Sequence, residues 1–311
     1  MHAKIVLLYE TETGKKICNA ASRVLAQTAV AFGHTISLPV RQCAYGNGVT
    51  DELLDFCSGA DAVLACESGM SCLTELASEL MCAVRVRDLR YASLIENRSL
   101  TGRDYPLNCV IVQALSNEST ALELAAKRAF EISAQEHLPI DQVPPSGKLA
   151  QAWQTAVGNA DSLSAPYHAR ELALPSVVPE MIYRTSRFGV LVCPPYAGSI
   201  LSEAAAALSG APGMCYDEYV GGECDLYAAL RDSEDAGNPF GMLRALFHLL
   251  KYTMKLEKEA ACLEAAASNV LHAGWRTSDI MSSDTQLTDI DGAAELICGQ
   301  IELAGSWIVE K

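Results

Sequence analysis

Short apolar runs alternate with helical segments over the first part of the chain, and this alternation constrains the fold more than any other feature. Strand-like runs cover residues 4–9, 34–39 and 60–66, and helical patterns cover residues 13–32 and 51–57. Continuous apolar strands are typical of parallel sheets whose two faces are covered by helices. The pattern predicts an α/β fold with a central, mostly parallel sheet flanked by helices.

The remainder of the chain continues this mixture of strands and helices. Gly-rich residues 210–222 are predicted to be irregular. A chain of 311 residues normally divides into two lobes, each with a buried core. Further strands are predicted at 107–112 and 189–193, and helices at 120–135, 148–156, 199–208, 240–252, 256–273 and 291–303.

Composition excludes several classes of partner. The formal net charge is -15, whereas a protein that binds duplex nucleic acid needs a basic surface. No run reaches the ~18–20 apolar residues that a membrane span requires. The first residues lead directly into the strand-like run 4–9, so a signal peptide is not expected. We therefore expect a cytoplasmic protein with neither a nucleic-acid nor a membrane partner.

Twelve cysteines raise the question of a metal site or a set of disulfides. None are spaced as C-x-x-C, and no Cys/His cluster has zinc spacing. Most lie inside apolar runs, such as Val192-Cys193 and Ile297-Cys298. This pattern favours free thiols that serve as small hydrophobic side chains in a reducing compartment.

Three segments carry recognisable motifs. Tyr196–Ala206 places Ser199 and Glu203 four residues apart, on one face of a predicted helix. Asn238–Tyr252 begins with Asn-Pro, and Val270–Asp279 contains Arg-Thr-Ser-Asp. They resemble N-L-F-G-D-I-L-S-D-E-A, N-P-x-x-x-I-L-S-x-x-x-x-L-x-Y and V-L-x-x-G-x-R-T-x-D of the isocitrate and isopropylmalate dehydrogenases. Residues 60–65 add a weaker match to K-A-D-A-V-L-L-G, so the resemblance covers nearly the whole chain.

This resemblance implies a two-lobed fold like that of isopropylmalate dehydrogenase. Residues 1–103 and 226–311 would form a cofactor-type lobe, and residues 104–225 a lobe for substrate and dimerisation. The family oxidises 2-hydroxyacids with NAD(P) and then decarboxylates them, with Mg²⁺ or Mn²⁺ bound. Its second-lobe helices, here those from Ser199 and Lys148, imply a homodimer, with a paralogous subunit as the alternative partner.

The substrate clamp of the family is largely replaced in this chain. The family segment L-R-K-x-L-x-L-x-x-x-x-R-P matches residues 76–87, which places Ala77 and Arg87 at two arginine positions. Gln113 occupies the third arginine position, on the following strand. One of three cations therefore remains to bind carboxylates. The alternative for Arg87 is a surface or domain-interface arginine.

The proton-transfer and metal positions are altered as well. Gln142 stands where the family has a catalytic lysine, and an amide does not titrate. Ser199, Glu203 and Pro175 stand where the family has three metal-binding aspartates, and the set offers one carboxylate and one hydroxyl. The alternative for Ser199 and Glu203 is an ordinary polar helix face. The family's tyrosine-bearing arm, which also clasps the dimer, is missing after Gln113.

Few cofactor positions persist. The family motif G-D-G-I-G-P-E matches residues 10–16, where only Gly14 is kept, and the adenine loop matches residues 228–235 with Arg231 and Asp232 in place of His and Gly. Asn238 is placed either to contact an adenine or to cap the helix that follows it. NAD(P) and Mg²⁺ or Mn²⁺ are thus family cofactors for which this chain keeps few binding residues.

These substitutions predict a catalytically inactive homologue that serves as a structural or regulatory subunit or binds another small ligand. Proton-transfer, clamp and metal groups act as a unit, so their joint replacement removes the ancestral reaction. Two alternatives stay open. One is an active enzyme of this fold with altered chemistry, and the other is an NAD(P)- and Mg-dependent 2-hydroxyacid oxidoreductase.

Overall fold

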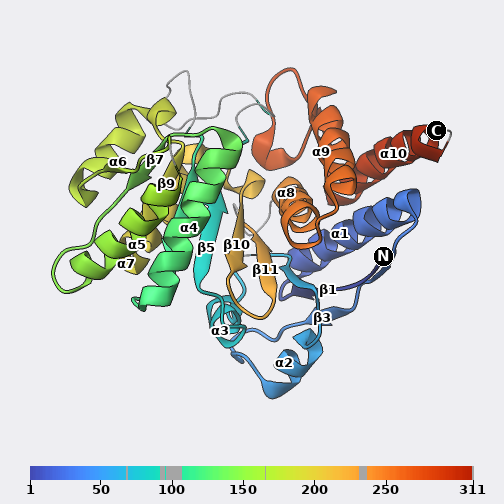
Figure 1. The fold of residues 1–311 in the computed structure, drawn as a ribbon. Coiled ribbons are helices and arrows are strands. Elements are labelled where there is room, and N and C mark those ends of the chain that lie inside the picture. The colour runs from blue at the N-terminus through green and yellow to red at the C-terminus, as the bar shows by residue number, and fades with distance from the viewer. Residues whose placement is uncertain (68, 92–94, 96–106, 165, 231–236, 310–311) are drawn as a thin grey trace. The chain divides into compact units, whose positions relative to one another are not determined.

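The chain forms two compact units in a computed structural model that describes residues 1–67, 69–91, 95, 107–164, 166–230 and 237–309. Unit 1 holds residues 1–80, 211–218 and 224–311, and unit 2 holds residues 81–210 and 219–223 (Figure 1). The predicted lobe boundary at 103/104 lies outside the described residues. The predicted boundary at 225/226 falls inside strand β11 (Asp225–Ala229).

A mostly parallel sheet forms the centre of unit 1. The strand order is β2-β1-β4-β11-β10, and β3 also pairs with β1. Strand β1 runs parallel to β2, β3 and β4, and β4 runs parallel to β11. The strands predicted at 4–9, 34–39 and 60–66 are confirmed. The bounds are β1 His2–Tyr9, β2 Thr35–Ser37, β3 Val40–Gln42, β4 Ala62–Ala65 and β10 Tyr216–Val220, with a separate parallel pair β12 Trp275–Arg276 and β13 Gln286–Leu287.

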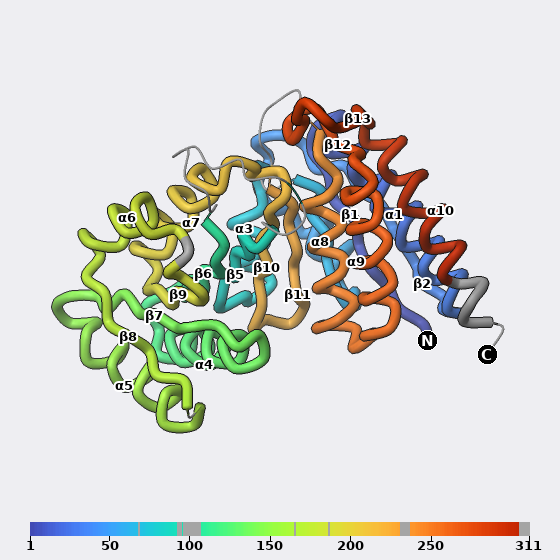
Figure 2. The backbone as a smooth tube through the Cα atoms, turned by 90° about the horizontal axis from the view of Figure 1, so that it is seen from above, coloured from blue at the N-terminus to red at the C-terminus, as the bar shows by residue number. Residues whose placement is uncertain are grey.

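The helices of unit 1 begin where the sequence supplies capping residues. The Thr11 hydroxyl accepts from Gly14 N at the start of α1 (Glu12–Phe32), and Gly33 ends that helix with a φ of 71°. The Thr50 hydroxyl likewise caps α2 (Asp51–Cys57) at Leu53 N. Helix α1 packs against α10 (Figure 2). The other helices are α3 Leu73–Glu79, α8 Phe240–His248, α9 Glu257–His272 and α10 Ile290–Val309.

A mostly parallel sheet also forms the centre of unit 2, in the order β5-β6-β9-β7-β8. Only the β5–β6 pair is antiparallel among the pairings described within this unit, and β6–β9, β7–β9 and β7–β8 are parallel. The strands are β5 Val84–Asp88, β6 Val110–Ala114, β7 Ile140–Gln142, β8 Arg170–Glu171 and β9 Val190–Cys193. The helices are α4 Ser119–Glu136, α5 Leu149–Leu163, α6 Leu174–Tyr183 and α7 Pro195–Ser209.

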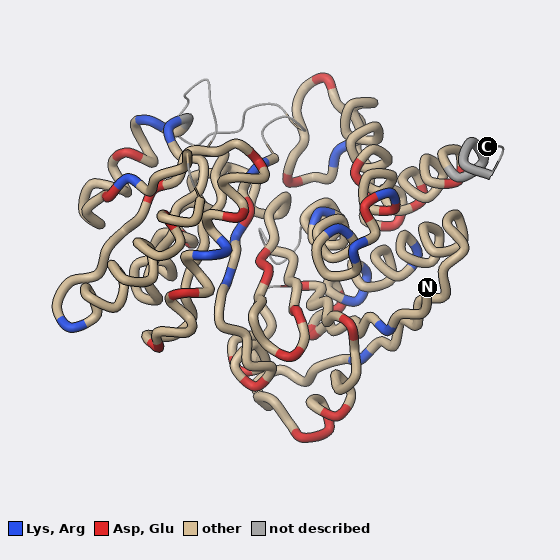
Figure 3. Tube along the Cα trace, in the orientation of Figure 1, with Lys and Arg blue, Asp and Glu red and all other residues tan. Residues whose placement is uncertain are grey.

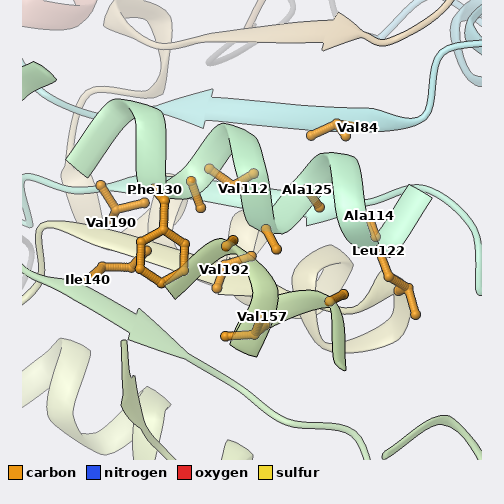
Figure 4. Packing of buried hydrophobic residues seen from close by; sticks show 14 of the residues in the cluster. Val84, Val112, Ala114, Leu122, Ala125, Phe130, Ile140, Val157, Val190 and Val192 are labelled. Carbon is orange, nitrogen blue, oxygen red and sulfur yellow. The ribbon is translucent and has the colours of Figure 1, made fainter. Parts of the chain in front are cut away.

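Alternate strand residues of unit 2 point to opposite faces of its sheet. Val112 and Val192 face α4 and α5, where they form a core with Phe130 (Figure 4). Gln113 faces the other way, against Gly198 of α7. Residues 115–118 are the whole connection from β6 to α4, so the short connection expected after Gln113 is present. The predicted α/β class with a mostly parallel sheet is confirmed.

Two local predictions differ from the structure. Residues 210–222 were predicted to be irregular, and this was wrong for the buried strand β10, because the Gly-rich turn at 221–222 concealed a short Tyr- and Val-containing strand. The helix predicted over 240–252 changes to π-helical turns at Leu249–Thr253. No helix within the described ranges is long and apolar enough to cross a membrane.

Truncation of Phe130 tests the core of unit 2. Phe130 is 1 % exposed, so Phe130→Ala leaves a cavity and is expected to lower the free energy of unfolding by about 3–5 kcal/mol. Leu163 is 87 % exposed on α5, so the control Leu163→Ala is expected to change stability by less than about 0.5 kcal/mol. Urea unfolding followed by circular dichroism measures both, and equal losses would contradict the assignment of this core.

Candidate functional site

One face of the unit 2 sheet gathers four of the predicted site positions. Arg87 lies on β5 and Gln113 on β6, while Ser199 and Glu203 lie one turn apart on α7. Gly198 makes this assembly close, because a Cβ at that position would lie 2.5 Å from Cγ of Gln113. Helix α7 therefore rests its backbone directly on the Gln113 side chain, which brings Ser199 and Glu203 to the sheet.

Arg87 forms an ion pair with Glu203. Its Nη1 lies 2.8 Å from Oε1 of Glu203, and the Arg87 side chain is 3 % exposed whereas Glu203 is 67 % exposed. The alternative of a surface arginine is therefore wrong. A buried guanidinium needs a carboxylate or an equivalent acceptor, and the largely exposed Glu203 supplies one.

Arg85 joins this pair and was missed by the sequence reasoning. Its Nη1 lies 3.8 Å from Oε1 of Glu203. The signal was available, because residues two apart on a strand face the same side and Arg85 precedes Arg87 by two. Glu203 thus forms ion pairs with two arginines on one strand.

The side-chain amide nitrogen of Gln113 makes two hydrogen bonds on the same face of the sheet. Its Nε2 donates to Oγ of Ser199 at 2.8 Å and to the Pro195 carbonyl at 2.9 Å. Ser199 Oγ in turn donates to the Pro195 carbonyl at 3.0 Å. Gln113 Oε1 is buried without a hydrogen-bond partner among the described residues. An arginine at this strand position would be cationic, whereas Gln113 is neutral and links β6 to α7 by hydrogen bonds.

Gln142 and Pro175 occupy other places in unit 2. Gln142 ends β7, and its Oε1 accepts a hydrogen bond from Nε1 of Trp153 at 2.9 Å. Beside it, Asp141 accepts from Nε of Arg170 at 2.6 Å, and burial raises the pKa of this carboxyl while Arg170 and Arg187 oppose the rise. Pro175 lies in the first turn of α6, where proline is favoured, and provides no side-chain oxygen.

The positions in unit 1 are likewise committed to packing. Ala77 is a buried residue of α3 at 2 % exposure. Gly14 lies in the first turn of α1, and a Cβ there would lie only 2.3 Å from Oε1 of Glu67. The Glu67 carboxylate accepts hydrogen bonds from Glu10 N, Thr11 N and Thr11 Oγ1 at 2.7, 2.8 and 2.7 Å. An internal carboxylate therefore occupies the space beside Gly14.

Asn238 caps the helix that follows it. Its Oδ1 accepts from Phe240 N at 2.8 Å, its Nδ2 donates to Oδ2 of Asp279 at 2.7 Å, and the residue is 4 % exposed. Of the two roles expected for Asn238, its contacts correspond to helix capping. Both the oxygen and the nitrogen of its side-chain amide are hydrogen bonded. Asp279 belongs to the Arg-Thr-Ser-Asp segment, so two motifs noted in the sequence bind each other.

The residues present do not fit the metal that the family uses. Mg²⁺ takes hard oxygen ligands, yet Pro175 has none, Ser199 is hydrogen bonded to Gln113, and Glu203 is paired with arginine. No group of three His, Cys, Asp or Glu residues that could hold a metal ion occurs within the parts of the chain that the structure describes. Beside Gly14, the Glu67 carboxylate would repel the phosphates of a nicotinamide cofactor.

Both units carry many acidic side chains. Figure 3 shows acidic positions on helices and loops of both units, in keeping with the net charge of -15. A cavity of about 590 Å³ in unit 1 is lined by residues that include Lys16, Thr277, Ser278 and Asp289. This cavity has a partly polar lining and is large enough for a small ligand.

Comparisons with known proteins point to one family. The sequence profile of isocitrate/isopropylmalate dehydrogenase matches residues 149–294. The 3-isopropylmalate dehydrogenase of Listeria innocua is 24% identical over 338 residues, which cover 93% of this chain and 96% of that protein. These matches support the isocitrate/isopropylmalate dehydrogenase family as the one that this chain resembles.

The similarity to these relatives is distant. The 3-isopropylmalate dehydrogenase of Moorella thermoacetica is 26% identical over 189 residues, which cover 58% of this chain and 53% of that protein. The crystal structure of isocitrate dehydrogenase from Methylococcus capsulatus shares the fold, with a TM-score of 0.78, 18% identity and coverage of 97% of this chain and 99% of that one. The fold is thus kept at low sequence identity.

A pair of glycine substitutions tests the seating of α7. Gly198→Ala would force its methyl group into Gln113 and is expected to destabilise the protein by roughly 1–3 kcal/mol. Gly158, inside α5, has nothing within 4 Å of an added Cβ, so the matched Gly158→Ala is expected to stabilise by about 0.5–1 kcal/mol. Urea unfolding compares the two, and stabilisation by both would refute the close approach at Gly198.

Proposed function

We propose that this chain is a catalytically inactive member of its family, acting as a structural or regulatory subunit or as a binder of another small ligand. The observation that carries the proposal is the pairing of Arg87 with Glu203 at 2.8 Å. The one retained clamp arginine is neutralised by the residue that stands at a metal position. Substrate and metal would therefore compete with a contact inside unit 2.

The proton-transfer position supports the same proposal. The family reaction needs a group at this point that gains and loses a proton. Gln142 cannot do so, and its carbonyl oxygen is used by the Trp153 indole at 2.9 Å. The residue therefore anchors β7 to α5, which is a packing role.

The cofactor position adds a third line of support. The Glu67 carboxylate binds the backbone at the start of α1 and lies against Gly14. Asn238 and Asp279 satisfy each other at 2.7 Å. The groups at these positions are engaged within unit 1 and are not displayed toward a dinucleotide.

The runner-up is an active oxidoreductase or an enzyme of this fold with altered chemistry. The observation in its favour is that relatives are named as 3-isopropylmalate dehydrogenases. The cavity of about 590 Å³ near Lys16 and Thr277 gives room for a small ligand in unit 1. A ligand there fits an inactive binder as well as an enzyme, so turnover distinguishes the candidates.

A turnover assay tests the inactive assignment. We expect no NAD(P)H formation from common 2-hydroxyacids, 3-isopropylmalate and isocitrate included, with Mg²⁺ or Mn²⁺ present. The expected kcat/KM is at least about 100-fold below that of an active family member, because proton transfer alone contributes 10²–10⁴-fold.

The Listeria innocua relative assayed in the same buffers is the positive control, and circular dichroism verifies that the tested chain is folded. Turnover comparable with that of the relative would overturn the inactive assignment. Turnover of 3-isopropylmalate or isocitrate would support the ordinary oxidoreductase, and turnover of another 2-hydroxyacid alone would support the enzyme with altered chemistry.

We also propose a cytoplasmic homodimer that assembles through helices of unit 2, with a paralogous subunit as the alternative partner. Helix α7 exposes Tyr196 at 75% and Ile200 at 43%, and Tyr183 on the adjoining α6 is 64% exposed. Tyr196 and Ile200 lie one turn apart on α7 and form an apolar stripe of the kind that helix pairs bury. All twelve cysteines are free thiols, which supports a reducing compartment.

Light scattering tests the dimer. The protein is expected to have the mass of two chains, and Ile200→Glu is expected to shift it to one chain, because a charge on the stripe would be buried unpaired. Val30→Glu is the matched control, since Val30 is 76% exposed on α1 of unit 1. A wild-type chain that stays monomeric at every concentration would contradict homodimerisation and leave a paralogous partner as the alternative.

A further inference from the structure

An exposed loop of unit 1 contains an asparagine that is followed directly by a glycine. Residues 43–50 join β3 to α2, and this loop includes Asn47 and Gly48 (Figure 1). Asn47 is exposed, and Tyr45 in the same loop is 84% exposed. The side-chain amide of Asn47 is therefore in contact with water, which is the reactant that hydrolysis of an amide consumes.

The backbone nitrogen that follows Asn47 is not held by a hydrogen bond. Asn47 N donates to the Ala44 carbonyl at 3.3 Å, and Val49 N donates to Oε2 of Glu75 at 2.9 Å. Gly48 N lies between them and makes no hydrogen bond with any residue that the structure describes. Backbone N–H groups are strong donors that a folded chain usually pairs. Gly48 N is thus available to react with the neighbouring side chain.

Glycine at position 48 also leaves this nitrogen uncovered. Gly48 has a φ of 63°, a conformation that residues with a side chain rarely adopt. A Cβ at this position would lie 2.8 Å from Oε2 of Glu75, so the contact with Glu75 requires glycine as well. Since residue 48 has no side chain, nothing on it shields its nitrogen from Cγ of Asn47.

The rest of the chain does not repeat this combination. None of the other asparagines in the sequence is followed by glycine. Asn117 is the closest match, because it is also exposed in a loop. Its neighbour Glu118 has a side chain, and Glu118 N donates to Oγ of Ser116 at 3.3 Å. Asn117 is therefore exposed to water to the same degree of classification as Asn47 but lacks the free nitrogen beside it.

We propose that Asn47 is a modification site, at which attack by Gly48 N converts the side-chain amide to a carboxylate. Gly48 N forms a bond to Cγ of Asn47, and the bond from Cγ to Nδ2 breaks. Nδ2 leaves as ammonia and takes up the proton that Gly48 N loses. The product of this step is a cyclic imide that includes Cγ of Asn47, the main-chain carbonyl carbon of Asn47 and Gly48 N.

Water then opens the imide at one of its two carbonyl carbons. Opening at Cγ breaks the new bond and gives aspartate. Opening at the main-chain carbonyl carbon gives isoaspartate, in which the backbone runs through the former side chain. The two steps together consume one water and release one ammonia, and nothing is oxidised or reduced. Asparagine is chemically labile in this sense, and no enzyme or cofactor is required.

The modified residue would lie between two hydrogen bonds that fasten the loop. Gly46 N donates to Oγ of Ser71 at 3.0 Å, and Val49 N donates to Glu75 of α3 at 2.9 Å. Isoaspartate adds one carbon to the backbone between these two bonds. The new carboxylate also brings a second negative charge to the loop that contacts Glu75, and like charges repel. Both changes are expected to loosen the loop.

Incubation of the full chain, followed by peptide mapping with mass spectrometry, tests the site. The folded protein is kept in neutral and in mildly alkaline buffer and sampled over time. We expect the Asn47 peptide to gain the mass by which a hydroxyl exceeds an amino group and to separate into aspartate and isoaspartate forms. An isoaspartyl methyltransferase with labelled S-adenosylmethionine is expected to label the second form. The conversion is expected to be faster in alkaline buffer, because the attacking nitrogen has to lose its proton.

Two matched variants serve as controls, and circular dichroism confirms that each is folded. Asn47→Gln is expected to abolish the conversion, because the longer side chain would have to close a larger ring, and Asn117→Gln is expected to retain it. Conversion of Asn47 only after unfolding in urea, equal conversion of Asn117, or aspartate without isoaspartate would overturn the proposal. None of these readouts depends on whether the chain has dehydrogenase activity.

Limited proteolysis tests the effect on the loop. Chains that carry isoaspartate are expected to be cut faster within residues 44–49 than Asn47→Gln chains incubated alongside them. Equal cutting of the two samples would contradict the loosening of the loop.

Discussion

The close approach of α7 to the sheet at Gly198 determines the chemistry of unit 2. A Cβ at Gly198 would lie 2.5 Å from the Gln113 side chain, so only glycine allows the helix to rest there. From that contact the helix phase follows, and Ser199 meets Gln113 while Glu203, one turn later, meets Arg87. The position of α7 on the sheet therefore sets both the Gln113–Ser199 hydrogen bond and the Arg87–Glu203 ion pair.

The two members of the Arg87–Glu203 ion pair differ in how deeply they are buried. Arg87 is 3 % exposed and Glu203 is 67 % exposed, so the buried guanidinium has an acceptor in a largely exposed carboxylate. A buried guanidinium without an acceptor carries a large desolvation penalty, whereas an exposed carboxylate is solvated with or without its partner. Arg87 is thus retained with its own counter-ion supplied by the chain, and the need for a bound carboxylate is removed.

The sequence predicted the elements well and the contacts only in part. Buried runs such as residues 60–66 and caps such as Thr50 depend on local composition, so they were recognisable. The pairing of Gln113 with Ser199, or of Asn238 with Asp279, joins residues 86 and 41 positions apart, and a linear pattern carries no signal for it. Glu67 was missed for the same reason, since nothing near residue 67 indicates that its carboxylate lies against Gly14.

Glu67 and Glu203 solve the same physical problem in different units. Each carboxylate lies where donors would otherwise need an external anion. Glu67 accepts hydrogen bonds from the backbone at the start of α1, and Glu203 accepts one from Arg87 and forms a longer ion pair with Arg85. Such donors attract phosphates and carboxylates when they are vacant. An internal carboxylate satisfies them permanently and adds negative charge that repels a ligand of the same sign. The proposed loss of affinity for anionic ligands and the retention of the fold would then rest on the same two side chains.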